Sequence, residues 1–482
     1  MNEQDSLQMK GLLSRMGYDD VPEPDDADLV LFVTCSIREK AVHKVYSDLG
    51  RLKPFIEENP DRIVGLAGCV AQQEKENLVK RFPFLDLVFG PDAIGRLPDM
   101  VKTVRRNRGL KDKKPVVETR FSSRRDFEFV NLIVPGDENR VKAFVTIQKG
   151  CDNGCSFCIV PRVRGPEVSR SADDIVREVR ELVSLGVKEV TLLGQNVNSY
   201  GKKFSGEISF ARLLRRIACE TGSPGGAGSP GGAGSPGGAD IQRLRFTSSH
   251  PQDVGDDLVQ CYADLPVLCS HFHLPVQSGS NRVLKAMRRG YTRGDYFEII
   301  DKVRQARPGI ALSTDFIVGF PGETRKEFEE TLDLLQKIGF DMSYSFVYSP
   351  RPGTRAAGLK DDVPLAEKEK RLQILQALQT EIAQEKNDLL VGRIEEVLVE
   401  KEDGFGQNVS GRTGSNKIVH IPGKDGLTGQ MVQVRITKAN PYSLGGEVSD
   451  GRRHSEPAER DDSRKGDGAD DRSVHQHADH HP

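Results

Sequence analysis

The sequence predicts an α/β protein in three parts: an N-terminal doubly wound α/β domain, a central partial β/α (TIM-like) barrel and a C-terminal small β-barrel. Three observations support this division. Strand-like apolar runs alternate with helical patterns up to about residue 365, a long charged helical segment follows, and short strands separated by glycine-containing turns fill residues 391–448. A chain of 482 residues has room for about three domains of roughly 150 residues each.

Composition excludes several classes of protein. The net charge is only −2 and charged residues are dispersed, so any contact with nucleic acid must come from local patches. The N-terminus has no apolar signal segment, and no apolar run approaches the about 18 residues that a membrane span needs. We therefore expect a cytoplasmic protein without membrane contact, in which the eight cysteines bind metal more readily than they form disulfides.

Residues 1–125 are predicted to form the N-terminal domain and a basic linker. Residues 6–16 have the pattern of an amphipathic helix, and residues 29–34 and 62–67 read as buried parallel strands. Cys35 and Cys69 stand at or next to the ends of these strands. Ligand sites of doubly wound sheets lie beyond the carboxyl ends of the strands, so we expect both thiols to face one pocket. Taken alone, two such cysteines are more often core residues than ligands.

The basic segment at residues 101–125 carries ten lysines and arginines against two acids. We interpret it as a solvated linker, with phosphate binding as the alternative.

The central domain, residues 137–368, reads as repeated strand-helix units. The clearest unit is a helix from Ser171, a plausible cap, to Gly186, a plausible stop, followed by a strand at 187–193. Further strands are predicted at 143–148, 243–248, 271–276, 311–319 and 343–349. Successive parallel units indicate a partial or full β/α barrel, whose active site lies at the carboxyl ends of its strands.

Polar and glycine residues cluster after these strands. They include Gln195 and Asn196, Ser248 and Ser249, Gln277 and Ser278, and the run from Gly319 to Glu323. Amide side chains and glycine-exposed backbone can bind a polar ligand without adding charge, although ordinary turn chemistry is the alternative for each residue.

The most specific motif is a cysteine triplet. Cys151, Cys155 and Cys158 are spaced C-x3-C-x2-C within eight positions. Three thiolates on a short loop can hold three irons of a 4Fe-4S cluster and leave the fourth iron open, whereas a closed zinc site needs four ligands. A zinc-binding or redox-sensing cluster is the alternative, but the loop contains no histidine to favour zinc. We expect Cys219, Cys261 and Cys269, which lack ligand spacing, to be buried thiols.

Three further segments complete the chain. Three copies of GSPGGA occupy residues 222–239, a flexible insert that we expect at the barrel's amino-terminal face, away from the chemistry. A linker helix is predicted over 369–386, within a helical pattern from about 363 to 388, and the small β-barrel over 387–449. The tail at 450–482 contains five of the ten histidines and is predicted to be disordered, with metal binding as the alternative.

These motifs resemble those of a known enzyme family. The cysteine triplet, with Phe157 before its third cysteine, resembles the radical-SAM signature, and MNEQDS, VTCSIREKA and AGCVAQ resemble the N-terminal domain of methylthiotransferases. GRTGSNKIVHI and ITKANPYSLGGEV resemble the TRAM domain, an RNA-binding barrel of OB-like form. CIVPRVRGPEVSR, LLGQNVNSYG and STDFIVGFPGET are most similar to the group that modifies N6-isopentenyladenosine in tRNA.

The resemblance implies two 4Fe-4S clusters and S-adenosylmethionine (SAM). Cys151, Cys155 and Cys158 would hold the SAM-binding cluster, and Cys35 and Cys69 would hold part of an auxiliary cluster. The family's first auxiliary cysteine stands two residues before the methionine that corresponds to Met1. The sequence as written therefore lacks it, and we expect a start codon assigned too late, with a truncated protein that has an impaired auxiliary cluster as the alternative.

Further roles follow from the same resemblance. Gln195 and Asn196 would hold the SAM amino group and Gln277 would meet the ribose, with Ser248, Asp315 and Gly319 as further cofactor-binding candidates. Four residues of the small barrel are the expected RNA contacts: Arg412, Asn416, Lys417 and Lys438. The alternative is that they lie in ordinary solvated turns.

The implied reaction replaces the hydrogen on carbon 2 of a tRNA adenine by a methylthio group. That C–H bond has no acidic proton, so the cofactors must supply a radical. Expected partners are the tRNA anticodon stem-loop and a reductant such as flavodoxin or ferredoxin, and we expect a monomer. The alternatives are a sister methylthiotransferase acting on threonylcarbamoyl-adenosine or on a ribosomal-protein aspartate, and a non-catalytic zinc-containing RNA-binding protein.

Overall fold

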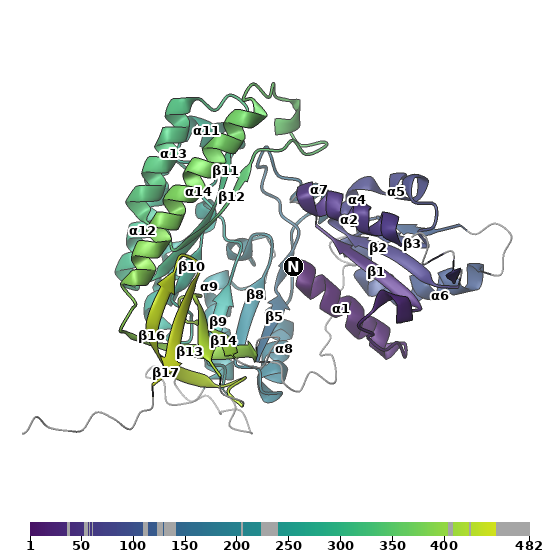
Figure 1. Ribbon diagram of the computed structural model, residues 1–482, viewed down its shortest axis with the longest axis horizontal. Coiled ribbons are helices and arrows are strands. Elements are labelled where there is room, and N and C mark those ends of the chain that lie inside the picture. The colour runs from purple at the N-terminus through teal and green to yellow at the C-terminus, as the bar shows by residue number, and fades with distance from the viewer. Residues whose placement is uncertain are drawn as a thin grey trace, which may run out of the picture.

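The computed structural model shows three domains in chain order (Figure 1). It describes residues 1–35, 39–52, 56, 58–59, 61–108, 114–122, 129, 141–203, 206–222, 240–402, 408–423 and 426–449. The repeat at 223–239 and the tail at 450–482 lie outside the described residues, so the predictions made for them stay predictions. No helix in the described part of the chain is long and apolar enough to cross a membrane.

The N-terminal domain is the predicted doubly wound α/β domain. Its parallel sheet has the order β1 (Leu29–Thr34), β2 (Ile63–Gly68), β3 (Leu87–Phe89) and β4 (Val116–Glu118). One core lies against α1 (Asn2–Arg15) and α6 (Leu97–Asn107). The other core lies against α2 (Glu39–Arg51), α4 (Cys69–Glu74) and α5 (Glu76–Arg81). Short 3-10 helices span Pro24–Asp26 and Pro91–Arg96.

The interpretation of residues 101–125 as a linker is wrong for much of the segment. Residues 97–107 form α6, which buries Val101 and Val104, and residues 116–118 form β4, paired with β3. The basic side chains had concealed an apolar stripe at helical spacing, Leu97, Met100, Val101 and Val104. A high charge density on one helix face is compatible with a packed opposite face.

In the described residues, the central domain is an open barrel of six parallel strands. The first sheet contains β5 (Lys142–Thr146), β8 (Glu189–Leu193) and β9 (Arg243–Phe246); the second contains β10 (His271–His273), β11 (Ala311–Val318) and β12 (Met342–Val347). A bridge between Leu244 and Leu268 connects the two sheets. The apolar core lies between the strands and the surrounding helices, which are α8 (Ala172–Ser184), α9 (Phe210–Thr221), α10 (Asp256–Asp264), α11 (Asn281–Met287), α12 (Arg293–Ala306) and α13 (Arg325–Ile338).

Local sequence explains where these helices begin and end. The Ser171 hydroxyl caps α8 by accepting from the backbone of Asp174 at 3.3 Å, as predicted. Thr292 and Thr324 start α12 and α13 with complete capping boxes. The residues that flank the repeat segment lie side by side, because the backbone of Ile241 donates to the carbonyl of Thr221 at 3.0 Å. These flanking residues lie ahead of β9, at the amino ends of the strands.

The C-terminal domain is a closed barrel of five strands. The helix α14 (Leu365–Asp388) runs along the central domain and leads into β13 (Ile394–Glu402). The barrel order is β13, β14 (Asn408–Thr413), β15 (Ile418–Pro422), β17 (Ser443–Val448) and β16 (Met431–Asn440). The sequence had not predicted β17, whose glycines weaken its strand pattern. At Gly446 a Cβ would come within 2.7 Å of the Arg435 carbonyl, so this strand needs the glycine.

Candidate functional site

The cysteine loop begins where the first barrel strand ends. Two short strands, β6 (Gln148–Lys149) and β7 (Val168–Ser169), pair antiparallel and close the base of the loop. At Gly150 the backbone has φ +72° and a Cβ would overlap the carbonyl of Pro166, so a glycine is required there. The short helix α7 (Val160–Val163) follows the third cysteine. The three cysteines thus lie at the carboxyl end of the barrel, where the sequence predicts the active site.

The loop is fixed to the C-terminal end of α11. The backbone and hydroxyl of Ser156 donate to the carbonyls of Met287 and Ala286, both at 2.9 Å, and its own carbonyl accepts from Ala356 at 2.8 Å. Phe157 packs on the apolar cluster that contains Met287. The aromatic residue of the motif therefore anchors the loop.

The thiols of the loop differ in exposure: Cys151 is buried, whereas Cys155 and Cys158 are partly exposed. The pKa of Cys151 is raised to about 12 and that of Cys158 to about 11, mainly by burial, and the neighbouring thiols of the loop contribute to both rises. Metal binding must therefore displace protons from these sulfurs. In the described part of the chain, no three His, Cys, Asp or Glu side chains already converge as a metal site. The donor set itself, three sulfurs on one loop without a fourth residue, fits a cluster with one open iron better than a closed zinc site.

Two residues that the sequence analysis missed face Cys155. Arg289 Nη1 lies 3.4 Å from the Cys155 sulfur, and His250 Nε2 lies 4.0 Å from it. The backbone of Gln252 donates to His250 Nδ1 at 3.2 Å, which leaves the proton of the neutral ring on Nε2, toward the sulfur. Burial, with Arg289 adding to it, lowers the pKa of His250 to about 3. Neither residue belongs to a recognisable motif, and both are remote from the cysteine in sequence.

Polar atoms without partners surround the same strand ends. The Gln195 side-chain oxygen accepts from the backbone of Gly150, and the Asn196 amide donates to Asp253 at 2.7 Å. Among the described residues, five buried side-chain atoms of this region have no hydrogen-bond partner: Gln148 Oε1, Glu167 Oε1, Gln195 Nε2, Asn196 Oδ1 and Ser249 Oγ. An orphaned buried polar atom costs about 1–3 kcal/mol, so this set fits a polar ligand such as SAM.

The structure gives less direct support for the other predicted cofactor contacts. Ser248 and Gln277 adopt left-handed backbone conformations, with φ of 68° and 74°, which are strained for non-glycine residues. Asp315 lies 3.6 Å from the His273 ring. Gly319 has φ +68° and donates to Glu323 at 2.6 Å. Their roles in cofactor binding stay predictions.

Cys35 and Cys69 come together as expected from their strands. The strands β1 and β2 pair in parallel up to Thr34 and Gly68, so a cysteine follows each at the same edge of the sheet. Cys69 packs against Ile159 and Val163, which belong to the segment that follows the cysteine triplet. The two candidate cysteine sites therefore lie on either side of α7.

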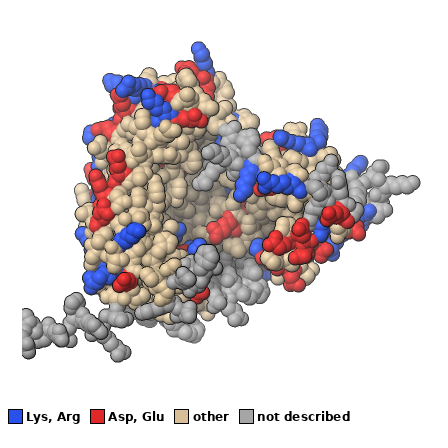
Figure 2. Space-filling model, in the orientation of Figure 1, with Lys and Arg blue, Asp and Glu red and all other residues tan. Residues whose placement is uncertain are grey.

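Arg164 joins the two domains at this point. Its guanidinium makes a buried pair with Asp5 of α1, at 2.5 Å, and also contacts the Cys69 thiol. Burial raises the pKa of Cys69, and the Arg164 charge opposes that rise. A second buried pair, Lys149 with Asp92, lies across the same boundary. Figure 2 shows the surface hollowed between the central and N-terminal domains.

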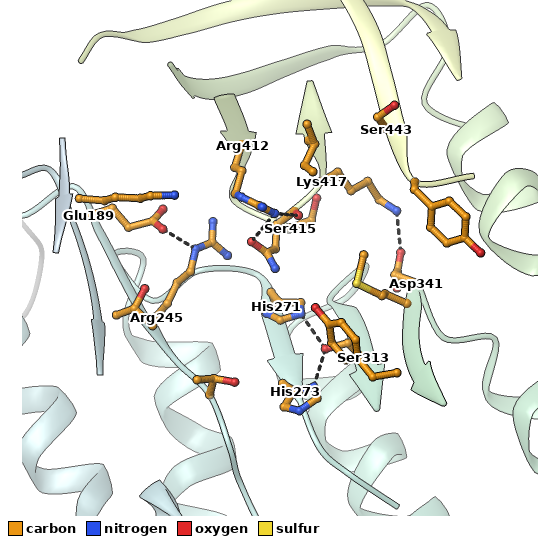
Figure 3. A pocket seen from close by; sticks show the side chains of 18 of the residues that line it. Glu189, Arg245, His271, His273, Ser313, Asp341, Arg412, Ser415, Lys417 and Ser443 are labelled. Atoms are coloured by element: carbon orange, nitrogen blue, oxygen red, sulfur yellow. Dashed lines mark hydrogen bonds and ion pairs between the residues drawn. The ribbon is translucent and has the colours of Figure 1, made fainter. Parts of the chain in front are cut away.

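Three of the four predicted RNA contacts face the central barrel instead of open solvent. Lys417 pairs with Asp341 at 2.9 Å and donates to Asn387 at 2.7 Å, and Arg412 donates to Asn416 (Figure 3). All three line a cavity of about 400 Å³ between the two barrels, together with His271 and Arg245. Lys438 is exposed on β16. The structure thus gives Arg412, Asn416 and Lys417 a role in domain contact that solvated turns would not have.

The fold and the cysteine loop define a radical-SAM protein with an additional N-terminal domain and a TRAM domain. Three family models match in this order: "Uncharacterized protein family UPF0004" at residues 1–90, "Radical SAM superfamily" at 145–335 and "TRAM domain" at 388–449. They confirm the three predicted parts.

Similar proteins narrow the class to one family. The chain is 46% identical over 453 residues to a protein of Chromobacterium violaceum, covering 93% of this chain and 96% of that one. It is 46% identical over 460 residues to a protein of Neisseria meningitidis serogroup C, covering 93% and 97%. It is 47% identical over 450 residues to a protein of Myxococcus xanthus, covering 92% and 91%. Each is named tRNA-2-methylthio-N(6)-dimethylallyladenosine synthase, and this chain belongs to that family.

Proposed function

We propose that this chain attaches a methylthio group to carbon 2 of N6-isopentenyladenosine, next to the anticodon of tRNA. The single observation that carries the proposal is the identity of 46% over 93% of the chain to a synthase of that name. The loop of Cys151, Cys155 and Cys158 at the carboxyl end of the barrel supports it.

Each cysteine site has a role in this proposal. Cys151, Cys155 and Cys158 hold the SAM-binding 4Fe-4S cluster, and Cys35 and Cys69 contribute to an auxiliary cluster. With SAM bound, the first cluster supplies the one-electron chemistry that can remove hydrogen from an unactivated C–H bond.

The chain's own residues bind the cofactor and keep water away. The orphaned atoms of Gln195, Asn196 and Ser249 are free to hydrogen-bond the polar groups of SAM. Arg289 and His250 direct N–H groups toward the Cys155 sulfur. Burial of Cys151 limits access of water to its sulfur.

The C-terminal barrel supplies the RNA-binding part of the proposal. Exposed Lys438 is the candidate for a phosphate contact, and the target base would be unstacked in the anticodon loop, where proteins can reach its edges. We expect the protein to act in the cytoplasm as a monomer, with flavodoxin or ferredoxin as reductant.

Nucleoside mass spectrometry of tRNA tests the proposal. The chain is expressed in a bacterial strain that lacks its own synthase, and 2-methylthio-N6-isopentenyladenosine is expected to appear. A Cys155→Ala variant serves as the negative control.

Other products would assign a different function. Methylthiolated threonylcarbamoyl-adenosine, or a methylthiolated ribosomal-protein aspartate, would identify a sister activity. Anaerobically purified protein that contains one zinc and no iron would identify a non-catalytic RNA-binding protein.

A further inference from the structure

Arg289 is a buried arginine that has no carboxylate partner in the part of the chain that the structure describes. Only 5% of the residue is exposed. Its nitrogens donate to the Pro275 carbonyl at 2.8 Å, the Tyr291 hydroxyl at 3.0 Å and the Cys155 sulfur at 3.4 Å. No Asp or Glu of the described residues forms an ion pair with it. Burying a charge without compensation costs several kcal/mol, so an anion is expected at this position.

The backbone holds the arginine and the cysteine in one unit. The helix α11 ends at Met287 and is followed by Arg288, which has a left-handed φ of 59°, and Gly290 has φ +73°. This turn directs Arg289 inward. The same helix end accepts both hydrogen bonds from Ser156, the residue after Cys155. The guanidinium and the sulfur therefore keep their relative position without contributions from the other domains.

We propose that Arg289 is a positioning residue that pairs with the Cys155 sulfur once this sulfur is a metal-bound thiolate, and that it raises the reduction potential of the SAM-binding cluster. A positive charge and an N–H donor stabilise the more negative, reduced form of the cluster. The neutral His250 adds a second, weaker donor on the same sulfur. The inference rests on the proposed function, because it assumes a cluster on the three cysteines.

The other arginine beside a candidate ligand provides an internal contrast. Arg164 contacts Cys69, but Asp5 already compensates its charge. Arg289 has no such acid among the described residues, so its charge is available to the Cys155 sulfur.

The test is a redox titration monitored by electron paramagnetic resonance, without SAM. Full-length protein that carries Cys35→Ala and Cys69→Ala is reconstituted anaerobically, so that only the SAM-binding cluster contributes. Arg289→Gln is expected to shift the midpoint potential to a more negative value, and Arg289→Lys to a value between those of Arg289→Gln and the parent. Arg288→Asn is the matched control, because it removes an exposed positive charge one residue away and asparagine tolerates a left-handed φ.

Each outcome decides the question. If Arg289→Gln leaves the midpoint potential unchanged but increases the dissociation constant of SAM, the guanidinium binds the SAM carboxylate and the proposal is overturned. An equal shift in Arg288→Asn would also overturn it. Arg289→Gln could take up less iron than its parent. In that case a normal iron content in Arg289→Lys supports a role for the positive charge, and an iron content as low as that of Arg289→Gln contradicts it. A parent protein without iron would instead refute the proposed function.

Discussion

The two cysteine sites of this protein are built differently. The central site places Cys151, Cys155 and Cys158 on one loop, and the residues that support it, Arg289 and His250, belong to the same domain. The N-terminal site takes Cys35 and Cys69 from neighbouring strands. The arginine that contacts this N-terminal site, Arg164, belongs to the central domain.

This difference determines what each site requires. The central loop depends on its own barrel, through Ser156 and the end of α11. The N-terminal pair is completed by Arg164 and by apolar contact with Ile159 and Val163, so it needs the two domains to be docked. A substitution at the domain boundary should therefore disturb the N-terminal site first.

The largest effect is expected at the central loop. Cys155→Ala removes one of three ligands that no other residue of the loop can replace, so methylthiolated tRNA should fall to the level of a strain without the protein. Mass spectrometry of tRNA nucleosides measures this. Cys219 on α9 provides the control, because it is exposed and the prediction that it is buried is wrong, and Cys219→Ala should leave the product level unchanged. Full activity of Cys155→Ala would show that the central loop does not need all three of its cysteines.

The domain boundary is expected to show the next largest effect. Asp5→Ala leaves the buried Arg164 without its acid, which should lower the free energy of unfolding by about 3–5 kcal/mol. Urea denaturation of the metal-free protein measures it. The exposed pair Lys10 and Asp20 is the control, and Lys10→Met should cost less than about 1 kcal/mol. Equal effects of the two substitutions would show that docking does not depend on this pair.

Acid should destabilise the central domain through its buried histidines. Burial lowers the pKa of His250 and His271 to about 3, whereas unfolding returns each ring to an ordinary value near 6.5. The unfolded chain binds more protons between these values, so stability is full above pH 6.5 and falls as the pH decreases toward 3. The free energy of unfolding falls by at most about 1.4 kcal/mol per pH unit for each histidine.

Denaturation across that pH range measures the contribution. His250→Asn should reduce the number of protons taken up on unfolding by about one, and so make the dependence of the free energy of unfolding on pH less steep. The substitution His420→Asn, at an exposed residue, should leave this dependence unchanged. A slope that His250→Asn does not alter would argue against a buried neutral ring beside Cys155.

The smallest effect is expected from deleting residues 223–239. The flanking residues Thr221 and Ile241 are already hydrogen-bonded at 3.0 Å, so a short turn can replace the repeat. The free energy of unfolding should change by less than about 1 kcal/mol, and methylthiolation should continue. Loss of product would show that the amino-terminal face of the barrel contributes to the reaction.

Much of the fold could be predicted from the pattern of apolar residues. The strand at Leu29–Thr34 has the predicted bounds, and the helix Leu365–Asp388 lies within the predicted pattern. These segments carry their signal locally, through a continuous apolar run or an uninterrupted run of helix-forming residues. The strand Ser443–Val448 was missed because its glycines weaken the strand pattern, and only the contact with the neighbouring strand shows that Gly446 is required there.

The sequence by itself determined the three domains and the cysteine triplet, because periodicity and the spacing of three thiols are properties of short segments. Only the tertiary structure decided which charges support the sulfurs. Arg289 is 134 residues from Cys155, and Asp5 is 159 residues from Arg164. The tertiary structure also placed Lys417 against Asp341. Such pairs form when the chain folds and excludes water from charged groups, and the one-dimensional order of residues carries no record of that proximity.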